Sequence, residues 1–340
     1  MTESWIVAET RTVDLQDARL NARFRDVLAQ LSERPTASIP AACGGHAEMT
    51  AAYRLFANGH ATFARILAPH TEVTRQRMAA QATVVLVQDT TEIDVTRPAQ
   101  QVAGAGPLGA GVRRGLLLHL LHAFTPDGTP LGTLAGAPWA RDERASCASL
   151  SRAQRAAIPL ANKESYRWLE TFDQARAEAA RCPGTRLISV CDSEADIYEV
   201  LRAAQAEPRR LDWIVRGCQD RALQRAAGET TTRYLHETVL GQPVLFSQTI
   251  HVRGREQKVA CETRGRRQPR RTRSARVQVR SARVTLRSPW PAAGQRPAIE
   301  VNVVLVREID APRDDEPIEW LLLTSLPVGT AAEAREVIQY

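Results

Sequence analysis

The stretch 186–201 constrains the fold of this chain more than any other feature of its sequence. It begins with the apolar run Leu-Ile-Ser-Val-Cys at 187–191, which is typical of a buried strand. Asp192 follows that run directly, and a helical pattern opens at Ser193. Open α/β sheets bind their ligands at the carboxyl ends of such strands. The sequence therefore predicts an α/β fold with Asp192 at its functional edge.

A second run of the same design lies earlier in the chain. The apolar residues 84–87 lead through Gln88 to Asp89, and Thr90 follows. Two buried strands that each deliver one aspartate favour a shared divalent-metal site. Mg²⁺ in proteins commonly takes few carboxylates and completes its shell with waters and phosphate oxygens. The residues alone leave a second interpretation open, in which both aspartates are strand-end or helix N-cap residues.

The order of the predicted elements narrows the fold. We expect a hairpin of strands at 115–124 and 130–139, a helix at 162–180, the Asp192 strand and its helix, and a strand at 211–216. The glycine-rich stretch 104–111 lacks the Lys-Ser or Lys-Thr of a phosphate loop, which favours a plain connection. This order resembles the ribonuclease-H-like nucleotidyltransferase fold. In that fold the first and fourth strands are neighbours, which would bring Asp89 and Asp192 together.

Residues 1–78 read as helical. An apolar stripe at helical spacing predicts one helix with Asp17 as its N-cap and Arg34-Pro35 as its end; the stripe is Leu20, Phe24, Val27, Leu28 and Leu31. Three arginines are expected on the polar side of that helix: Arg19, Arg23 and Arg25. A further helix from about His46 to Ala57 should bury Met49, Tyr53 and Phe56. Short helices with arginines outside fit a helix-turn-helix-like DNA-binding module, and equally a small packing domain.

Positive charge is concentrated in one segment. The formal net charge is +7, and residues 251–287 hold twelve arginines and one lysine against two glutamates. Within 276–280 and 283–287, aliphatic and basic residues alternate, which predicts two strands in a β-rich insertion with a cationic face. The candidate phosphate contacts are Arg266, Arg267, Arg270, Arg271 and Arg273. An arginine-rich surface that serves only solubility is the alternative.

The remaining composition points to the cytoplasm. The six cysteines are scattered without a C-x-x-C pair, so a structural zinc site is not expected. Cys191 lies in an apolar strand, as a reduced thiol would. The longest apolar run, 115–124, is shorter than the roughly 20 residues that span a bilayer, and the first residues do not form a signal peptide. We expect no membrane partner.

Short motifs along nearly the whole chain together resemble bacterial cut-and-paste transposases of the insertion-sequence-four family. In order, they are Leu15-Gln16-Asp17-Ala18-Arg19, the stretch Ala51–Asn58, Gln88-Asp89-Thr90-Thr91, Gly106-Pro107-Leu108-Gly109, Lys163-Glu164-Ser165, Cys191–Ile197 and Trp320–Ser325. The resemblance implies that Asp89 and Asp192 are two of three carboxylates in a site for two Mg²⁺ ions. It implies that Asp196 and Glu194 are supporting residues.

The resemblance also assigns a role to each region. Residues 1–78 would bind the inverted-repeat ends of transposon DNA as duplex, and 79–216 would be the ribonuclease-H-like core. Residues 217–318 would be the basic insertion that helps to hold DNA, and 319–340 would be the last core strand and the start of the catalytic helix. The chemistry implied is phosphodiester cleavage and strand transfer by a homodimer on DNA.

The end of the sequence departs from the family pattern. The family places its third carboxylate in a Tyr-x-x-Arg-x-x-x-Glu motif, and this sequence stops at Tyr340, at or just before that tyrosine. Glu333 and Glu336 come too early to replace it and are expected to be solvated. We therefore expect a C-terminally truncated transposase that holds at most one Mg²⁺, lacks the pairing region and is inactive alone. The alternative is a non-catalytic DNA-binding regulator of transposition.

Overall fold

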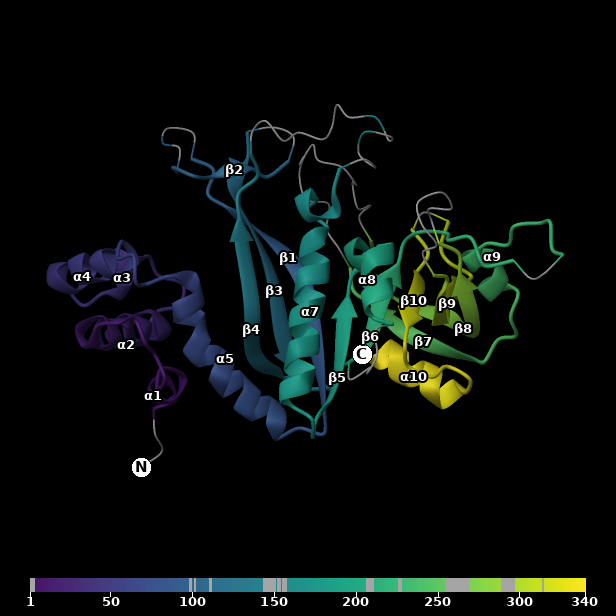
Figure 1. Cartoon of the computed structure of the whole chain (residues 1–340), viewed down its shortest axis with the longest axis horizontal. Coiled ribbons are helices and arrows are strands. Elements are labelled where there is room, and N and C mark those ends of the chain that lie inside the picture. Colours follow the sequence, from purple (N-terminus) through teal and green to yellow (C-terminus); the bar gives the residue numbers. More distant parts are fainter. Residues whose placement is uncertain are drawn as a thin grey trace.

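The structure is a computed structural model of the chain. It describes residues 4–97, 100, 102–109, 112–142, 151, 154, 158–205, 211–225, 228–254, 270–288, 297–313 and 315–340. In this part of the chain a group of N-terminal helices leads into a ten-stranded mixed sheet with helices against both of its faces (Figure 1). None of the helices described is long and apolar enough to cross a membrane.

The N-terminal helices are α1 (Trp5–Glu9), α2 (Ala18–Glu33), α3 (Ile39–Ala42), α4 (His46–Phe56) and α5 (Phe63–Ala79). The predicted start of α2 is confirmed, because the Asp17 carboxylate accepts a hydrogen bond from the Arg19 backbone N–H at 2.7 Å. The helix ends before Pro35, also as predicted. A small separate core joins these helices, built from Val13, Leu15, Phe24, Val27, Cys43, Ala52 and Leu55.

Helix α4 forms where predicted, but of the three residues expected to be buried only Met49 packs against the N-terminal core, where it is half-buried. Tyr53 and Phe56 are 48% and 46% exposed, so the expectation that they are core residues is wrong. Ala52 and Leu55 occupy the core instead. The helix is turned so that its smaller side chains meet the other helices, and two aromatic rings remain on the surface. Hydrophobic periodicity predicted the helix but not its rotation.

The strands are β1 (Thr83–Asp94), β2 (Gly106–Pro107), β3 (Arg114–Phe124), β4 (Pro130–Trp139), β5 (Arg186–Cys191), β6 (Leu211–Gly217), β7 (Phe246–Val252), β8 (Arg273–Leu286), β9 (Ile299–Ile309) and β10 (Glu319–Thr324). Their order across the sheet is β2-β3-β1-β5-β6-β10-β9-β8-β7, with β4 paired to β3. The sheet is mixed, because β1, β5 and β6 are parallel neighbours while the other pairs are antiparallel. The predicted hairpin is therefore confirmed, and β2 pairs with β3 rather than opening a phosphate-binding helix.

Helices pack on the two faces of the sheet. One face packs against α7 (Tyr166–Arg181), α8 (Tyr198–Ala203) and α9 (Leu235–Leu240) around the buried rings of Trp213 and Phe172. Figure 1 shows α7 lying along β1 and β5. The other face packs against α10 (Ala331–Gln339), whose Ala334 and Val337 contact a cluster that includes Ile188. The predicted strand at 319–324 and the helix starting near Thr330 are confirmed.

Helix α5 connects the N-terminal helices to the sheet. Its Thr71 hydroxyl donates to the Leu134 carbonyl of β4 at 3.2 Å. At Gly132 the backbone φ is +145°, and an added Cβ would lie 2.1 Å from the Thr74 hydroxyl. His70 of α5 accepts a hydrogen bond from the Thr133 N–H through Nε2 at 2.9 Å, while its Nδ1 lies 2.7 Å from the buried Glu9 carboxylate. These contacts tie α1, α5 and β4 together.

The strands of residues 217–318 do not form a separate β-structure beside the sheet. β9 pairs directly with β10, and β8 and β7 follow, so these strands extend the central sheet. The two predicted basic strands are the single strand β8. Val277 and Val279 face the cluster under α10, whereas Val284 and Leu286 face the cluster under α9. The aliphatic residues of β8 thus point to one face of the sheet in its first half and to the other face in its second half. The arginines of β8 therefore do not share one face, and the prediction of a single cationic face is wrong.

Candidate functional site

The two predicted acidic residues lie side by side on neighbouring strands. Strands β1 and β5 are parallel, and their pairing ends with Gln88 opposite Cys191. Asp89 and Asp192 are the next residue on each strand, and both are exposed. The prediction that Asp89 lies at the tip of its strand is wrong, because β1 continues along β3 to Asp94 after β5 has ended. The structure thus brings both aspartates to one edge, whereas their metal-binding role stays a prediction.

Each of these carboxylates also accepts a local hydrogen bond. Asp89 Oδ1 accepts from the Thr90 N–H at 2.8 Å. Asp192 Oδ1 accepts from the Glu194 N–H at 2.7 Å and caps a 3-10 turn at Ser193–Ala195. The expected continuous helix after Asp192 is instead this 3-10 turn followed by α8. The capping interpretation is therefore correct for Asp192, and it leaves room for metal binding because a carboxylate has several acceptor sites.

Further carboxylates surround the pair. Burial raises the pKa of Glu194, and the nearby charges of Asp192, Asp89 and Glu164 raise it further. Glu164 forms a two-pronged pair with Arg141, at 2.6 Å to Nε and 2.8 Å to Nη2, and this hydrogen bond lowers the pKa of Glu164. We call Asp89, Asp192, Glu194 and Glu164 the acidic edge. Arg141 offsets the charge of Glu164, and the remaining carboxylates favour a cation. Sequence reasoning missed the Arg141 contribution, because nothing local links residues 141 and 164.

One arginine at this edge was also missed. The β5–β6 pairing ends with Cys191 opposite Val215, so Arg216 is the residue beside Asp192 on β6. Arg216 is exposed and pairs across β10 with Leu322. A guanidinium beside a carboxylate pair can bind a phosphate that a metal ion also contacts. The sequence did contain a signal for Arg216: it is a basic residue at the end of a predicted buried strand, in the position where Asp192 supplies an acidic residue to the neighbouring strand.

The donor set suits Mg²⁺ better than a transition metal. Asp89 and Asp192 would supply oxygen ligands, and because both are exposed, waters and phosphate oxygens could complete the shell. Among the residues that the structure describes, no group of three His, Cys, Asp or Glu side chains is placed to hold a metal ion. A site of two carboxylates on adjacent strands nevertheless fits a hard ion that keeps most of its waters.

The part of the basic segment that leads into β8 lies at the same edge of the sheet. Because β10 runs antiparallel to β6, β9 to β10 and β8 to β9, the first residue of β8 lies at the edge where β6 ends. Arg270 and Arg271 lie three and two residues before the start of β8. Arg271 is exposed, and Arg270 donates through Nε to the Arg253 carbonyl at 3.1 Å. Arg266 and Arg267 lie outside the described residues.

Arg273 differs from its neighbours. Its side chain is only 12% exposed, and its Nη2 donates to the Glu308 carboxylate at 2.8 Å. Its Nε lies 3.4 Å from the Asp315 carboxylate. A guanidinium held in this way is not available to DNA phosphates. Arg273 is therefore a structural residue in this structure, which corrects its assignment as a phosphate contact.

The three N-terminal arginines do not share one side of α2. Arg19 and Arg23 are spaced i, i+4 and lie on one face, with Arg19 exposed and Arg23 half-buried. Arg25 lies on another side of the helix and donates through Nη2 to the Thr10 carbonyl at 3.4 Å. Arg25 thus connects α2 to the segment after α1. The structure separates it from the other two candidates.

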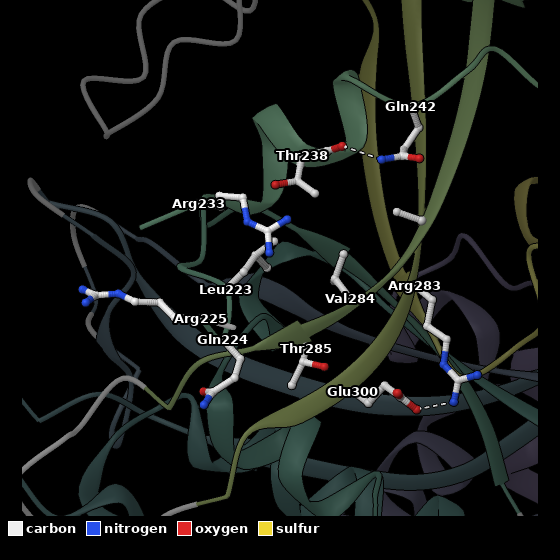
Figure 2. Close-up of a pocket in the computed structure, with 11 residues that line it drawn as sticks. Leu223, Gln224, Arg225, Arg233, Thr238, Gln242, Arg283, Val284, Thr285 and Glu300 are labelled. Atoms are coloured by element: carbon white, nitrogen blue, oxygen red, sulfur yellow. Dashed lines mark hydrogen bonds and ion pairs between the residues drawn. The ribbon is translucent and has the colours of Figure 1, made fainter. Parts of the chain in front are cut away.

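A polar pocket of about 450 Å³ lies beside β8 and α9. Figure 2 shows Arg225 and Arg283 at opposite sides of it, with Leu223 and Val284 between them. Arg283 is hydrogen-bonded to Glu300, and Arg225 donates to the Thr232 hydroxyl at 3.0 Å. The β8 residues that line the pocket belong to the end of that strand away from Arg273. The pocket is therefore separate from the acidic edge.

Comparison with known proteins identifies the N-terminal region. Residues 2–61 match the protein-family model for transposase DNA-binding. The matched residues contain α1 to α4, so this part of the chain is similar to transposase DNA-binding domains. Among solved structures, the piggyBac transposase synaptic complex with hairpin DNA aligns at 11% identity with a TM-score of 0.38, a likeness too distant to assign a fold. That alignment covers 99% of this chain, which spans 56% of the length of the piggyBac chain.

The arginines of α2 should differ in their effect on DNA affinity. In the full chain, Arg19→Ala and Arg23→Ala should each weaken preference for an inverted-repeat end over scrambled duplex, because both side chains share one face of α2. Arg25→Ala should leave the preference intact, because its side chain contacts the Thr10 carbonyl. Competition binding with the two duplexes measures this. Equal loss for all three variants would contradict the assignment by helix face.

The arginines before β8 should contribute non-specific affinity. Replacing Arg270 and Arg271 together with alanine should reduce the slope of log K against log salt by about 0.9 for each DNA phosphate that the variant no longer neutralises. A matched double variant of Arg202 and Arg176, which lie on α8 and α7, controls for the removal of two positive charges elsewhere. An unchanged slope in the Arg270 and Arg271 variant would show that this edge does not bind DNA.

Proposed function

We propose that this chain is a transposase-type protein that binds transposon-end duplex DNA and holds two carboxylates of a Mg²⁺-dependent phosphodiester-transfer site. The core sheet would then be of the ribonuclease-H-like type. One observation supports the proposal: β1 and β5 end their pairing with Gln88 opposite Cys191, so that Asp89 and Asp192 follow directly, in a chain whose residues 2–61 match the family model for transposase DNA-binding. Neither strand needs an acidic residue at that position to bury its aliphatic side chains.

The charges around the site support the same proposal. Negative charge from Glu194 and Glu164 surrounds the aspartate pair, while Arg216 lies on the adjacent strand. The start of β8, preceded by two arginines, lies at the same edge of the sheet. An edge with carboxylates at its centre and arginines around it fits a metal ion bound between protein and a polyanion.

The residues of this chain would divide the work as follows. Asp89 and Asp192 would hold the divalent ion through carboxylate oxygens. Arg216 would bind a phosphate oxygen of the DNA and orient the backbone against the edge. Arg270 and Arg271 would hold the flanking backbone, and α2 would select the end sequence. When bound, the metal would supply Lewis-acid stabilisation of charge on the phosphodiester oxygens.

Metal titration of the purified 340-residue chain tests the proposal. Mn²⁺ serves as a paramagnetic substitute for Mg²⁺, and the free ion is counted by electron paramagnetic resonance. Wild type should bind Mn²⁺, and Asp89→Asn or Asp192→Asn should each abolish measurable binding, because each removes one of only two charged ligands. Asp94→Asn is the matched control, since Asp94 is on the same strand but pairs with Arg113.

The outcomes separate the two candidate functions of this chain. Binding that persists in both Asp89→Asn and Asp192→Asn would refute the metal site. If wild type binds transposon-end DNA but no Mn²⁺, the non-catalytic DNA-binding regulator becomes the better description. Loss of Mn²⁺ binding in Asp94→Asn as well would point to general electrostatic attraction by the acidic edge.

A further inference from the structure

Asp196 is the most completely satisfied carboxylate near the acidic edge. Its side chain is fully buried, and its partner Arg221 is 10% exposed. Asp196 Oδ2 accepts hydrogen bonds from the backbone N–H groups of Cys218 and Gln219, at 2.9 and 3.0 Å. Oδ1 accepts from the Arg221 guanidinium, at 2.9 Å from Nε. The pair is fixed by geometry as well as by charge.

The backbone of the same turn is held by the same segment. The Asp196 carbonyl accepts from Arg221 Nη2 at 2.7 Å and from the Gln219 side-chain amide at 2.8 Å. The Cys218 thiol lies 3.3 Å from the Ser193 carbonyl. Residues 218–221 therefore brace the turn 192–197 at two of its carbonyls and at a carboxylate.

The sheet itself does not fix Asp192. Strand pairing of β5 ends at Cys191 on both of its sides, toward β1 and toward β6. Asp192 is the first residue beyond the ladder, and its direction is set by the turn that it caps. The brace to residues 218–221 is the strongest set of bonds that the structure describes between this turn and its surroundings.

We propose that Asp196 is a positioning residue, which through its buried pair with Arg221 holds the turn so that Asp192 faces Asp89. This inference rests on the proposed function, because it concerns the same metal site. Groups that orient a metal ligand commonly change metal affinity about 10- to 100-fold when they are replaced. Asp196 does not contact the metal in this proposal and acts only through Asp192.

The experiment compares two buried carboxylates with the same chemistry. Asp196→Asn should weaken Mn²⁺ binding by the full chain about 10- to 100-fold. It should also speed hydrogen exchange of the amides in 192–197. Glu308→Gln is the matched control, because Glu308 is also buried, pairs with Arg273 and lies on β9, away from the turn. It should leave Mn²⁺ affinity and the exchange of 192–197 as in wild type.

A second variant covers the case in which Asp196→Asn does not fold. Arg221→Lys keeps the positive charge but removes the fork of donors, so it should weaken Mn²⁺ binding less and still speed exchange in the turn. Unchanged Mn²⁺ affinity in the folded variants, or an equally large decrease in Glu308→Gln, would overturn the positioning role. Absence of Mn²⁺ binding in wild type would refute the proposed function itself. The positioning role depends on that function and would be refuted as well.

Discussion

Arg273→Met is expected to lower the free energy of unfolding by about 3–5 kcal/mol, the usual cost of removing one partner from a buried ion pair. The change leaves the carboxylates of Glu308 and Asp315 without their cation, and their side chains are only 3% and 9% exposed. The midpoint of urea unfolding by circular dichroism measures the decrease. Arg271→Met, an exposed arginine two positions earlier, should change stability by less than about 1 kcal/mol.

A double variant tests the cause of that decrease. Arg273→Met combined with Glu308→Gln should recover part of the stability, because it removes one of the uncompensated buried charges. Additive decreases would mean that packing of the arginine stem, and not charge, is responsible. DNA affinity in Arg273→Met at a temperature where the protein is folded should keep the wild-type salt slope, since this side chain does not reach phosphates.

Acid is expected to unfold the protein through His119. Burial lowers the pKa of this histidine from 6.5 to about 4, although the charge of Asp89 opposes the shift. The ring is 1% exposed, packs edge-on against Trp168 and lies 2.8 Å from the Thr90 hydroxyl. The folded state keeps the ring neutral until the pH nears 4, whereas the unfolded chain takes up a proton near 6.5. Stability is therefore present above pH 6.5 and lost as the pH falls toward 4.

The size of this effect follows from the shift. Lowering the pKa of His119 from 6.5 to about 4 corresponds to about 3 kcal/mol of stability lost between about pH 7 and pH 4. Urea unfolding across this pH range should show that decrease in wild type and a smaller decrease in His119→Gln, which cannot take up the proton. His46→Gln, which removes an exposed histidine of α4, is the control, and its urea unfolding should follow that of wild type. Equal pH dependence in all three proteins would contradict the assignment to His119.

The sequence predicted the parts of the site that depend on short-range pattern. Apolar runs leading to Asp89 and Asp192 were enough to place Asp89 in a strand and Asp192 directly after one, and their adjacency was predicted from the order of elements. The turn after Asp192 was harder, because Asp196 reads like one more polar residue of a helix. Its pairing with Arg221 depends on where the chain goes after β6, which no local pattern contains.

Side-chain direction and partner choice account for the other differences. Tyr53 and Phe56 were expected in the core because their spacing is helical, yet Ala52 and Leu55 have a compatible spacing and pack more closely. Arg271 and Arg273 lie in the same arginine-rich stretch of the sequence and cannot be told apart there. The fold places Glu308 and Asp315 beside Arg273. Long-range partners of this kind follow from strand order, which residue spacing does not determine.

The continuous pairing of β10, β9, β8 and β7 means that these strands cannot be deleted without affecting the rest of the sheet. Removing residues 246–309 would turn β10 into an edge strand and expose Trp320 and Leu322, which pack beside the cluster under α10. The same removal would open the opposite cluster, because Val284, Leu286, Val301 and Val303 belong to it. An exposed apolar edge of that kind promotes aggregation. These strands therefore cannot be removed as a separate unit without opening the clusters on both faces of the sheet.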